Sequence, residues 1–236
     1  MSLLVVFNLS VKLINGDCFS ILGKFNSSCI DCVICDPPYN IGIDEWDKDF
    51  DLSFLVSQIF RITKDCSNVI IFQGWSNVCG TIEAFNKYFT LKDWIIWDRV
   101  KGRGGTKSLV STREDILWFV KDSDNYTFNK VSSSIKKLTG GMGLKNGNEF
   151  RALSNVWIDV SPIVPWSKER VEHPTQKPVQ LMERCVSLWS NPNDVVLDFT
   201  MGSGSTGVAC KNLNRNFVGI EINKDYYDIA QSRIGV

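Results

Sequence analysis

The sequence of 236 residues has no excess charge, a single histidine and no long apolar run. Its 26 Lys and Arg balance 26 Asp and Glu, which excludes a strongly basic nucleic-acid binder and an acidic disordered tail as descriptions of the whole chain. The first ten residues, MSLLVVFNLS, contain only a short apolar run with no basic residue before it. We therefore expect neither a signal peptide nor a membrane span, and a cytoplasmic protein.

Apolar segments of strand length alternate with segments of helix length over most of the sequence. This alternation is typical of an α/β fold, in which helices cover both faces of a mostly parallel sheet. With 44% apolar residues the chain can form one sizeable core, so we expect one domain with an insertion. Strands are predicted at 11–15, 30–35, 68–72, 91–97, 116–121, 195–198 and 217–221, and helices at 51–64, 76–87, 178–189, 205–213 and 224–233.

Three of the eight cysteines, Cys29, Cys32 and Cys35, have a spacing found in some zinc and iron–sulfur sites. They coincide with a predicted buried strand, in which Cys32 faces away from the other two. We therefore interpret them as small packing residues of a protein with reduced thiols, and we expect no metal site there.

A predicted strand, a tight turn and the start of a helix follow one another in the segment Val195–Gly207. Gly202, Gly204 and Gly207 match G-x-G-x-x-G, and Glu221 ends the next predicted strand. Such glycines let the backbone approach a ligand, and the acid can bind a ribose diol, so the motif predicts a nucleoside cofactor. The motif alone does not separate NAD from S-adenosylmethionine. Because only about 30 residues follow it, the other strands must precede it, which indicates a circularly permuted sheet.

The segment Asp36-Pro37-Pro38-Tyr39 follows the strand predicted at 30–35, where parallel sheets bind their ligands. The prolines fix the turn and leave nearby carbonyl groups without local N–H donors. A carboxylate and a fixed carbonyl can accept both hydrogens of an amino group on an aromatic ring, which makes its lone pair nucleophilic. The ring of Tyr39 offers a face on which an extruded base can stack.

In the order of these two motifs, the sequence resembles the beta group of S-adenosylmethionine-dependent DNA amino-methyltransferases, the DNA adenine-N6 methyltransferase family. The segment Asn15-Gly16-Asp17-Cys18 is similar to the family's Gly-Asp block, and 173–178 match its His-Pro-Thr-Gln-Lys-Pro block. The resemblance implies a Rossmann-like sheet of seven strands, the strand at 116–121 being its last, antiparallel one, and S-adenosylmethionine as the cofactor. It implies that Asp36, Pro37, Pro38 and Tyr39 are catalytic and that Asp17, Thr175, Lys177, Asp198, Phe199, Thr200, Gly202, Gly204 and Glu221 bind the cofactor.

The resemblance also implies individual roles. Asp17 would accept the cofactor's exocyclic amine, and Thr175 and Lys177 would lie near its methionine carboxylate. His173 would have a positioning role rather than act as a general base, because an amine nucleophile needs little base before methyl transfer. The family usually has Asp-Pro-Phe before the glycine turn, whereas this sequence has Asp198-Phe199-Thr200, which leaves packing of the cofactor on Phe199 open.

From Asp122 to about Pro165 the alternation stops, and this stretch is either a functional insertion or a disordered linker. The family has its target-recognition region at this position. The chain would then divide into a catalytic half at 1–121, a target-recognition insertion at 122–170 and a cofactor-binding half at 171–236.

Basic residues concentrate in and before this insertion: residues 99–151 contain 11 Lys and Arg but 5 Asp and Glu, a charge of +6, which leaves −6 for the rest. The segment Lys101–Ser108 lacks the glycine that a nucleotide triphosphatase loop has before its lysine, so a DNA-contacting loop fits better. We expect salt-dependent DNA binding through this part of the chain, although a solvated basic loop is the alternative for any one residue. The candidates for DNA contact are Lys101, Arg103, Lys107, Lys136, Lys137, Lys145, Asn146, Asn148 and Arg151.

Together these features predict a site-specific DNA methyltransferase that acts on the N6 amine of an adenine flipped out of duplex DNA. No metal is needed, because the leaving thioether is neutral. Methylation of cytosine N4 is the alternative, although the family more often has Ser in place of Asp36 for cytosine. An NAD-dependent dehydrogenase and an inactive DNA-binding homologue are more distant alternatives. The resemblance suggests a homodimer of prokaryotic or phage origin, and it leaves open whether a cognate restriction endonuclease exists.

Overall fold

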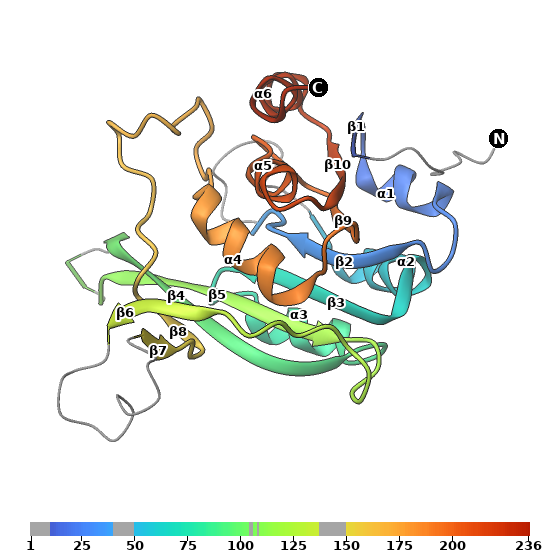
Figure 1. The fold of residues 1–236 in the computed structure, drawn as a ribbon, viewed down its shortest axis with the longest axis horizontal. Helices are drawn as coiled ribbons and strands as arrows, with labels where there is room; N and C mark the ends of the chain where they lie inside the picture. The colour runs from blue at the N-terminus through green and yellow to red at the C-terminus, as the bar shows by residue number, and fades with distance from the viewer. Residues whose placement is uncertain (1–9, 40–49, 104–105, 108, 137–149) are drawn as a thin grey trace.

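The computed structural model describes residues 10–39, 50–103, 106–107, 109–136 and 150–236. One eight-stranded sheet, in the order β1-β10-β9-β2-β3-β5-β4-β8, forms the centre of the molecule (Figure 1). The pairs from β1 to β3 in this order are parallel, β5 is antiparallel to both β3 and β4, and β8 is parallel to β4. The strands are β1 (Val11–Asn15), β2 (Ile30–Cys35), β3 (Thr63–Gln73), β4 (Thr90–Arg103), β5 (Ser111–Val120), β8 (Val156–Trp157), β9 (Val195–Asp198) and β10 (Asn216–Glu221).

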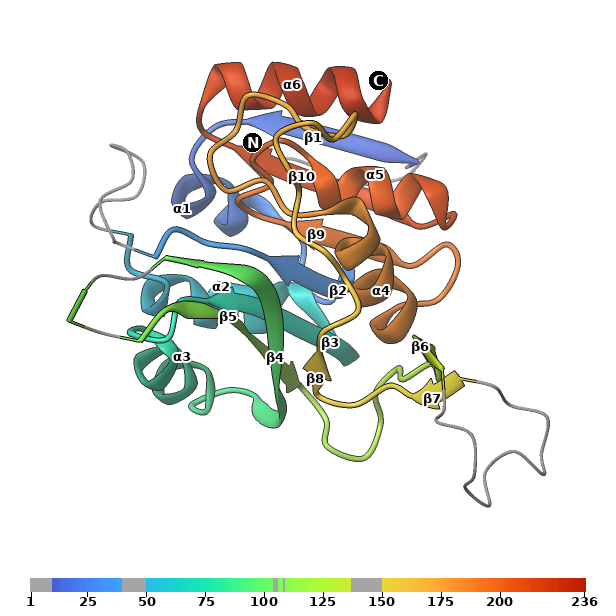
Figure 2. The ribbon, with the colours of Figure 1, turned by 90° about the vertical axis from the view of Figure 1, so that its left-hand side faces the viewer.

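Helices cover both faces of the sheet (Figure 2). Each face has its own cluster of buried apolar side chains. On one face lie α1 (Cys18–Ile21), the 3-10 helix η1 (Leu22–Lys24), α2 (Ser53–Ile62) and α3 (Val78–Phe85). On the other lie α4 (Val179–Trp189), α5 (Ser205–Asn212) and α6 (Lys224–Ile234). None of the described helices is long and apolar enough to cross a membrane. The predicted α/β architecture with helices on both faces is confirmed.

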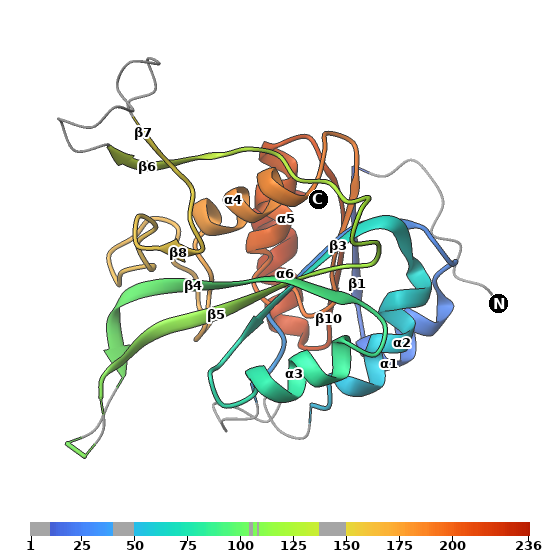
Figure 3. The ribbon, with the colours of Figure 1, turned by 90° about the horizontal axis from the view of Figure 1, so that it is seen from below.

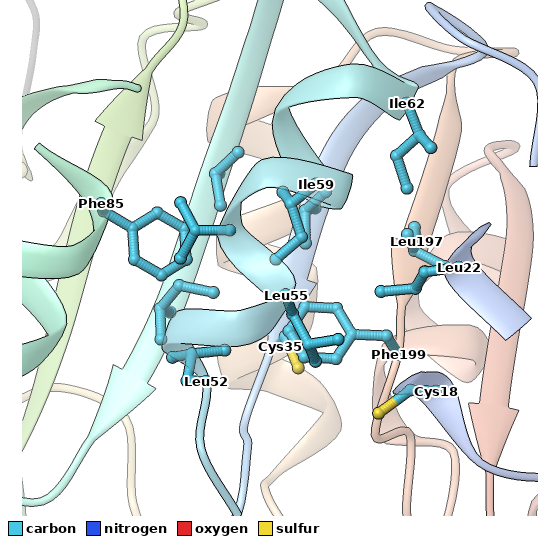
Figure 4. Close-up of a cluster of buried hydrophobic side chains, with 14 of the residues drawn as sticks. Cys18, Leu22, Cys35, Leu52, Leu55, Ile59, Ile62, Phe85, Leu197 and Phe199 are labelled. Carbon is cyan, nitrogen blue, oxygen red and sulfur yellow. The ribbon is translucent and has the colours of Figure 1, made fainter. Parts of the chain in front are cut away.

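The cysteines of β2 follow the alternation of an extended strand. Cys35 and the partly buried Cys29 pack in the cluster beneath α1, α2 and α3, whereas Cys32 packs in the cluster beneath α4, α5 and α6. Figure 4 shows Cys35 beside Leu55 of α2 and Phe199. The spacing that resembles a metal site is therefore produced by a strand that sends its side chains to both faces of the sheet.

All seven predicted strands and all five predicted helices are present, with helix ends that differ by at most two residues and strand ends that differ by up to six. The expected count of seven strands needs a correction, because β8 adds an eighth at the edge of the sheet. This strand comes from the predicted insertion, where Trp157 is buried and its indole N–H donates to the Ser154 carbonyl. Burial of this one large side chain accounts for the docking of so short a segment.

The described part of the predicted insertion is structured rather than a linker without secondary structure. The strands β6 (Ser132–Lys136) and β7 (Phe150–Ala152) pair in an antiparallel two-stranded sheet. The side chain of Asp159 fixes the first of them, since it accepts hydrogen bonds from the Ser134 backbone and hydroxyl and pairs with Arg184 of α4 at 2.7 Å. The insertion is thereby joined to the helical layer.

Candidate active site

Four parallel strands bring the sequence motifs to one edge of the sheet. Asp36 follows β2, Asp198 ends β9, Glu221 ends β10 and Asp17 follows β1 by two residues. Because these strands are parallel neighbours, their carboxyl ends meet at the same edge. The chain leaves β9 toward β10 and leaves β2 in the opposite direction toward β3, so the site lies at the reversal of strand order, where open α/β sheets bind ligands.

The glycine-rich turn after β9 is held by the acid at the end of β10. Gly202 and Gly204 have left-handed φ angles of 50° and 79°. The Gly202 amide donates to Glu221 Oε2 at 2.8 Å, and the Asn223 amide donates to Glu221 Oε1 at 2.8 Å. A β-carbon on Gly202 would lie 2.7 Å from His173 Nε2, so both the φ angle and the available space require glycine here.

Asp198 is a deeply buried carboxyl group at the start of the same turn. Its Oδ2 accepts a hydrogen bond from the Thr206 hydroxyl at 2.7 Å, and its Oδ1 accepts one from the Thr200 amide at 3.2 Å. Burial raises the pKa of Asp198 to about 7, and these two hydrogen bonds only partly oppose the shift. The side chain of Phe199 packs in the apolar cluster shown in Figure 4, with 1% of its surface exposed. Phe199 also lines the cavity described next.

A cavity of about 330 Å³ lies between the glycine-rich turn, the segment after β1 and the loop before α4. Its volume lies at the lower end of the range of small-molecule sites. Of the four carboxyl groups that line it, those of Asp17, Asp198 and Glu221 can accept hydrogen bonds from the amine and hydroxyl groups of a nucleoside, so the residues present fit S-adenosylmethionine. The predicted cofactor residues that line the cavity are Asp17, Thr175, Lys177, Asp198, Phe199, Thr200, Gly202 and Glu221, whereas Gly204 is not among the lining residues.

His173 forms part of the cavity wall. Its ring packs on Tyr226 with centroids 4.4 Å apart, and its Nδ1 accepts a hydrogen bond from the Thr175 amide at 3.3 Å. Burial, with the nearby positive charges of Lys177 and Arg233, lowers the pKa of His173 to about 4. The imidazole is therefore neutral at physiological pH, and its packing holds the predicted cofactor loop against the glycine turn.

Asp36 and Pro38 also line this cavity. The Tyr39 hydroxyl donates to Asp36 Oδ1 at 2.5 Å, and the Tyr39 carbonyl accepts a hydrogen bond from the Asn77 side chain at 2.6 Å. The Thr200 hydroxyl donates to the Asp36 carbonyl at 3.2 Å, so it links the Asp-Pro-Pro-Tyr segment to the glycine-rich turn. The two motifs, far apart in the sequence, form one site.

Lys177 also reaches Asp36 from the loop before α4. Its ammonium group pairs with Asp36 Oδ2 and lies 2.8 Å from Oε1 of Glu114, a residue of β5. Lys177 and Glu114 expose only 8% and 6% of their side chains. The Tyr39 hydroxyl lies 2.8 Å from the same Glu114 oxygen. Lys177, predicted near the cofactor carboxylate, thus lies in the cavity wall as the partner of two acids.

Lys177 lowers the pKa of both acids, but their net pKa shifts have opposite directions. Burial raises the pKa of Asp36, and the charge of Glu114 adds to the increase, so that the attraction of Lys177 does not compensate for them. Burial opposes ionisation of Glu114 as well, but Lys177, Arg99 and the Tyr39 hydroxyl outweigh it and lower the pKa of Glu114. Glu114 is therefore the more firmly ionised of the two acids, and Asp36 is the better proton acceptor.

Glu114, Arg99 and Asn77 did not emerge from the sequence motifs. The available signal was the pair Glu114-Asp115 directly before the apolar run at 116–120, because acids beside a buried strand need partners. The strand was predicted from residue 116, whereas β5 begins at Ser111 and buries both acids.

Of the predicted DNA-contacting residues, Lys107 and Arg151 have described side chains, and neither lines the cavity. Lys107, at the end of the β4–β5 hairpin, and Arg151, on β7, are exposed. Lys101 and Arg103 belong to β4, and Lys136 belongs to β6. The other candidates, Lys137, Lys145, Asn146 and Asn148, are outside the described residues.

Comparison with known proteins identifies the family. The profile of the N6/N4 family described as DNA methylase matches residues 30–232. The type II methyltransferase M.HpaI of Haemophilus parainfluenzae is 32% identical to this chain, and the match covers 94% of this chain and 74% of M.HpaI. The DNA adenine methyltransferase YhdJ of Escherichia coli K12 is 33% identical, and the match covers 97% of this chain and 84% of YhdJ. The crystal structure of the M1.HpyAVI–SAM complex matches with a TM-score of 0.71 and 29% identity over 96% of this chain and 100% of that one. The chain therefore belongs to the N6/N4 DNA methylase family.

Proposed function

We propose that this protein transfers the methyl group of S-adenosylmethionine to the N6 amine of an adenine that is flipped out of duplex DNA. One observation carries the assignment: Asp36 of the Asp-Pro-Pro-Tyr segment and Glu221 of the nucleoside motif line the same cavity. A single cavity lined both by acids that can bind a nucleoside and by an amine acceptor fits transfer between two bound ligands.

The cofactor would be held by residues around the glycine-rich turn. Asp17 and Glu221 offer carboxylate oxygens to the nucleoside, and the turn at Gly202 lets the backbone come close to it. Thr175, in the loop before α4, lines the part of the cavity near His173. When bound, S-adenosylmethionine supplies an electrophilic methyl group on a sulfonium centre, whose departure as a neutral thioether requires no acid.

The chain's own contribution to transfer is the orientation of the amine. Asp36 accepts one N–H, and the fixed backbone of Pro37-Pro38 offers a carbonyl to the other, which directs the nitrogen lone pair toward the methyl group. The segment is held on both sides, since Asn77 binds the Tyr39 carbonyl and Thr200 binds the Asp36 carbonyl. Such positioning accounts for much of the rate of a displacement between bound reactants. The raised pKa of Asp36, caused first by burial, suits it to take the proton that the methylated nitrogen releases.

The DNA would lie across the hairpin and the insertion. Figure 3 shows that the end of the β4–β5 hairpin and the β6–β7 pair both extend beyond the helical body of the molecule. The exposed charges of Lys107 and Arg151 are on these extensions and can contact phosphate groups. In this proposal 1–121 and 171–236 are the catalytic and cofactor-binding halves, and 122–170 recognises the target. A homodimer is a prediction from the family resemblance, a cytoplasmic location is a prediction from the first ten residues of the sequence, and a cognate restriction endonuclease is a candidate partner only.

An Asp36→Ala variant tests the proposal. We expect methyl incorporation into DNA to fall on the order of 100- to 1,000-fold, because a preorganised acceptor is lost. The affinity for S-adenosylmethionine, measured by calorimetry, should change little, and Asp228→Ala, on the exposed side of α6, is the control. Mass spectrometry of the digested DNA should detect N6-methyldeoxyadenosine. The proposal is wrong if the product is N4-methyldeoxycytidine or if the Asp36 variant retains the wild-type rate.

A further inference from the structure

Glu114 is a buried acid that contacts the proposed amine site but belongs to none of the sequence motifs. It lies on β5, the antiparallel strand, with 5% of its surface exposed. Its Oε1 lies 2.8 Å from the Tyr39 hydroxyl oxygen and pairs with Lys177 Nζ at 2.8 Å. Its Oε2 lies 3.8 Å from Arg99 Nε. One oxygen of Glu114 therefore meets two donors at the site.

The same two donors also contact Asp36. The Tyr39 hydroxyl lies 2.5 Å from Asp36 Oδ1, and the Lys177 ammonium pairs with Asp36 Oδ2. A tyrosine hydroxyl carries one hydrogen, so it donates to Asp36 or to Glu114 but not to both at once. Each donor thus has two alternative carboxylate acceptors, one at the substrate position and one behind it.

This arrangement resolves a conflict in the proposed reaction. Asp36 must offer an oxygen to the amine of the base, yet both of its oxygens already have a donor. A buried ammonium cannot leave one carboxylate unless another receives it, since an unpaired buried charge is strongly unfavourable. Glu114 is in contact with both donors and can retain them when Asp36 turns to the amine.

We infer that Glu114 is a positioning residue for methyl transfer, which holds Lys177 and the Tyr39 hydroxyl so that Asp36 is free to accept the substrate amine. The inference rests on the proposed role of Asp36. Glu114 itself acts through its two partners and need not touch the base. The lowered pKa of Glu114, set by Lys177 and Arg99 against the effect of burial, agrees with a permanent anion in this place.

The test compares Glu114→Gln with Glu114→Asp and with Glu83→Gln, an exposed acid of α3. Gln keeps the shape but removes the charge, so Lys177 would stay on Asp36. We expect kcat to fall by up to about 100-fold, the effect of misplacing a reacting group by about 1 Å. The Kd for S-adenosylmethionine and the unfolding midpoint should change little. Asp, which keeps the charge on a shorter side chain, should restore part of kcat, and the Glu83 variant should behave as wild type.

The pH profile distinguishes positioning from simple damage to the fold. Lys177, Tyr39 and Glu114 face Asp36, and Glu114 is the anion among them that raises the pKa of Asp36. In Glu114→Gln the acid limb of kcat should therefore move to lower pH, whereas a structural defect would lower kcat equally at every pH. An unshifted limb, or a kcat within about twofold of wild type, would overturn the inference. Failure of the proposed function is distinguishable, because the wild-type protein would then form no N6-methyladenine.

Discussion

Replacing Asp198 by asparagine should stabilise the protein increasingly as the pH rises from 5 to 8. Asp198 is buried at the end of β9 with 4% of its surface exposed, and burial raises its pKa from an ordinary 3.8 to about 7. Asparagine resembles the protonated acid: its oxygen can accept from the Thr200 amide, and its NH₂ group can donate to the Thr206 hydroxyl. The substitution therefore keeps the hydrogen bond from Thr200, reverses the direction of the one with Thr206 and removes the ability to ionise.

The sign follows from the protons bound in each state. Between pH 4 and pH 7 the folded protein retains the Asp198 proton while the unfolded chain has released it, so the free energy of unfolding falls as the pH rises. Above pH 7 both states are ionised and the loss is complete. Each pKa unit corresponds to about 1.4 kcal/mol, so the raised pKa predicts that the wild-type free energy of unfolding falls by about 3 kcal/mol between pH 5 and pH 8. The asparagine variant should not show this decrease.

Urea unfolding of the cofactor-free protein measures this difference at several pH values, with the fluorescence of its eight tryptophans as the signal. Only the change with pH matters, because any constant cost of the substitution cancels. Asp65→Asn, in a side chain that is 86% exposed, is the control and should show no such trend. A difference between wild type and Asp198→Asn that stays level from pH 5 to pH 8 would refute the reasoning.

Two further predictions concern the turn and the thiols. Gly202→Ala places a β-carbon 2.7 Å from His173 Nε2 at a left-handed φ, so the Kd for S-adenosylmethionine should rise at least about tenfold in calorimetry, and a change below twofold would contradict the packing. In a thiol-reagent assay of the native protein, the exposed Cys79 should react first, the half-buried Cys29 and Cys66 more slowly, and the five buried cysteines only on unfolding. Cys79→Ser should remove the fast phase, and a fast phase of more than one thiol is the contrary result.

The sequence predicted those parts of the site that depend on local chain geometry. The glycine-rich turn and the Asp-Pro-Pro-Tyr segment each follow a buried strand. An apolar segment of strand length can be recognised locally, so the candidate ligand-binding residues at its end can be located without knowledge of the rest of the fold. Their meeting in one cavity also followed from the alternation of strands and helices, because parallel strands share one carboxyl edge.

The ion pair of Lys177 and Glu114 could not be predicted, since it depends on the register of β5 against β3 and on the position of the loop before α4. Neither is encoded locally. The same limit applies to β8, which has two residues and is defined by what Trp157 packs against rather than by a pattern of its own. The insertion was recognised as a departure from the alternation, but the pairing of β6 with β7 has no comparable signature.

The first and last strands of the chain, β1 and β10, are neighbours in the sheet. The architecture of the site therefore does not depend on the order in which its motifs occur in the sequence. The Phe217 amide donates to the Ser10 carbonyl, and the Lys211 side chain reaches the last turn of α6, so both ends of the described chain lie at the edge of the sheet opposite the cavity. A chain joined there and opened within the insertion would traverse the same strands with the glycine-rich turn first. Which motif is translated first is therefore a matter of connectivity alone, and evolution can rearrange it without moving a reacting group.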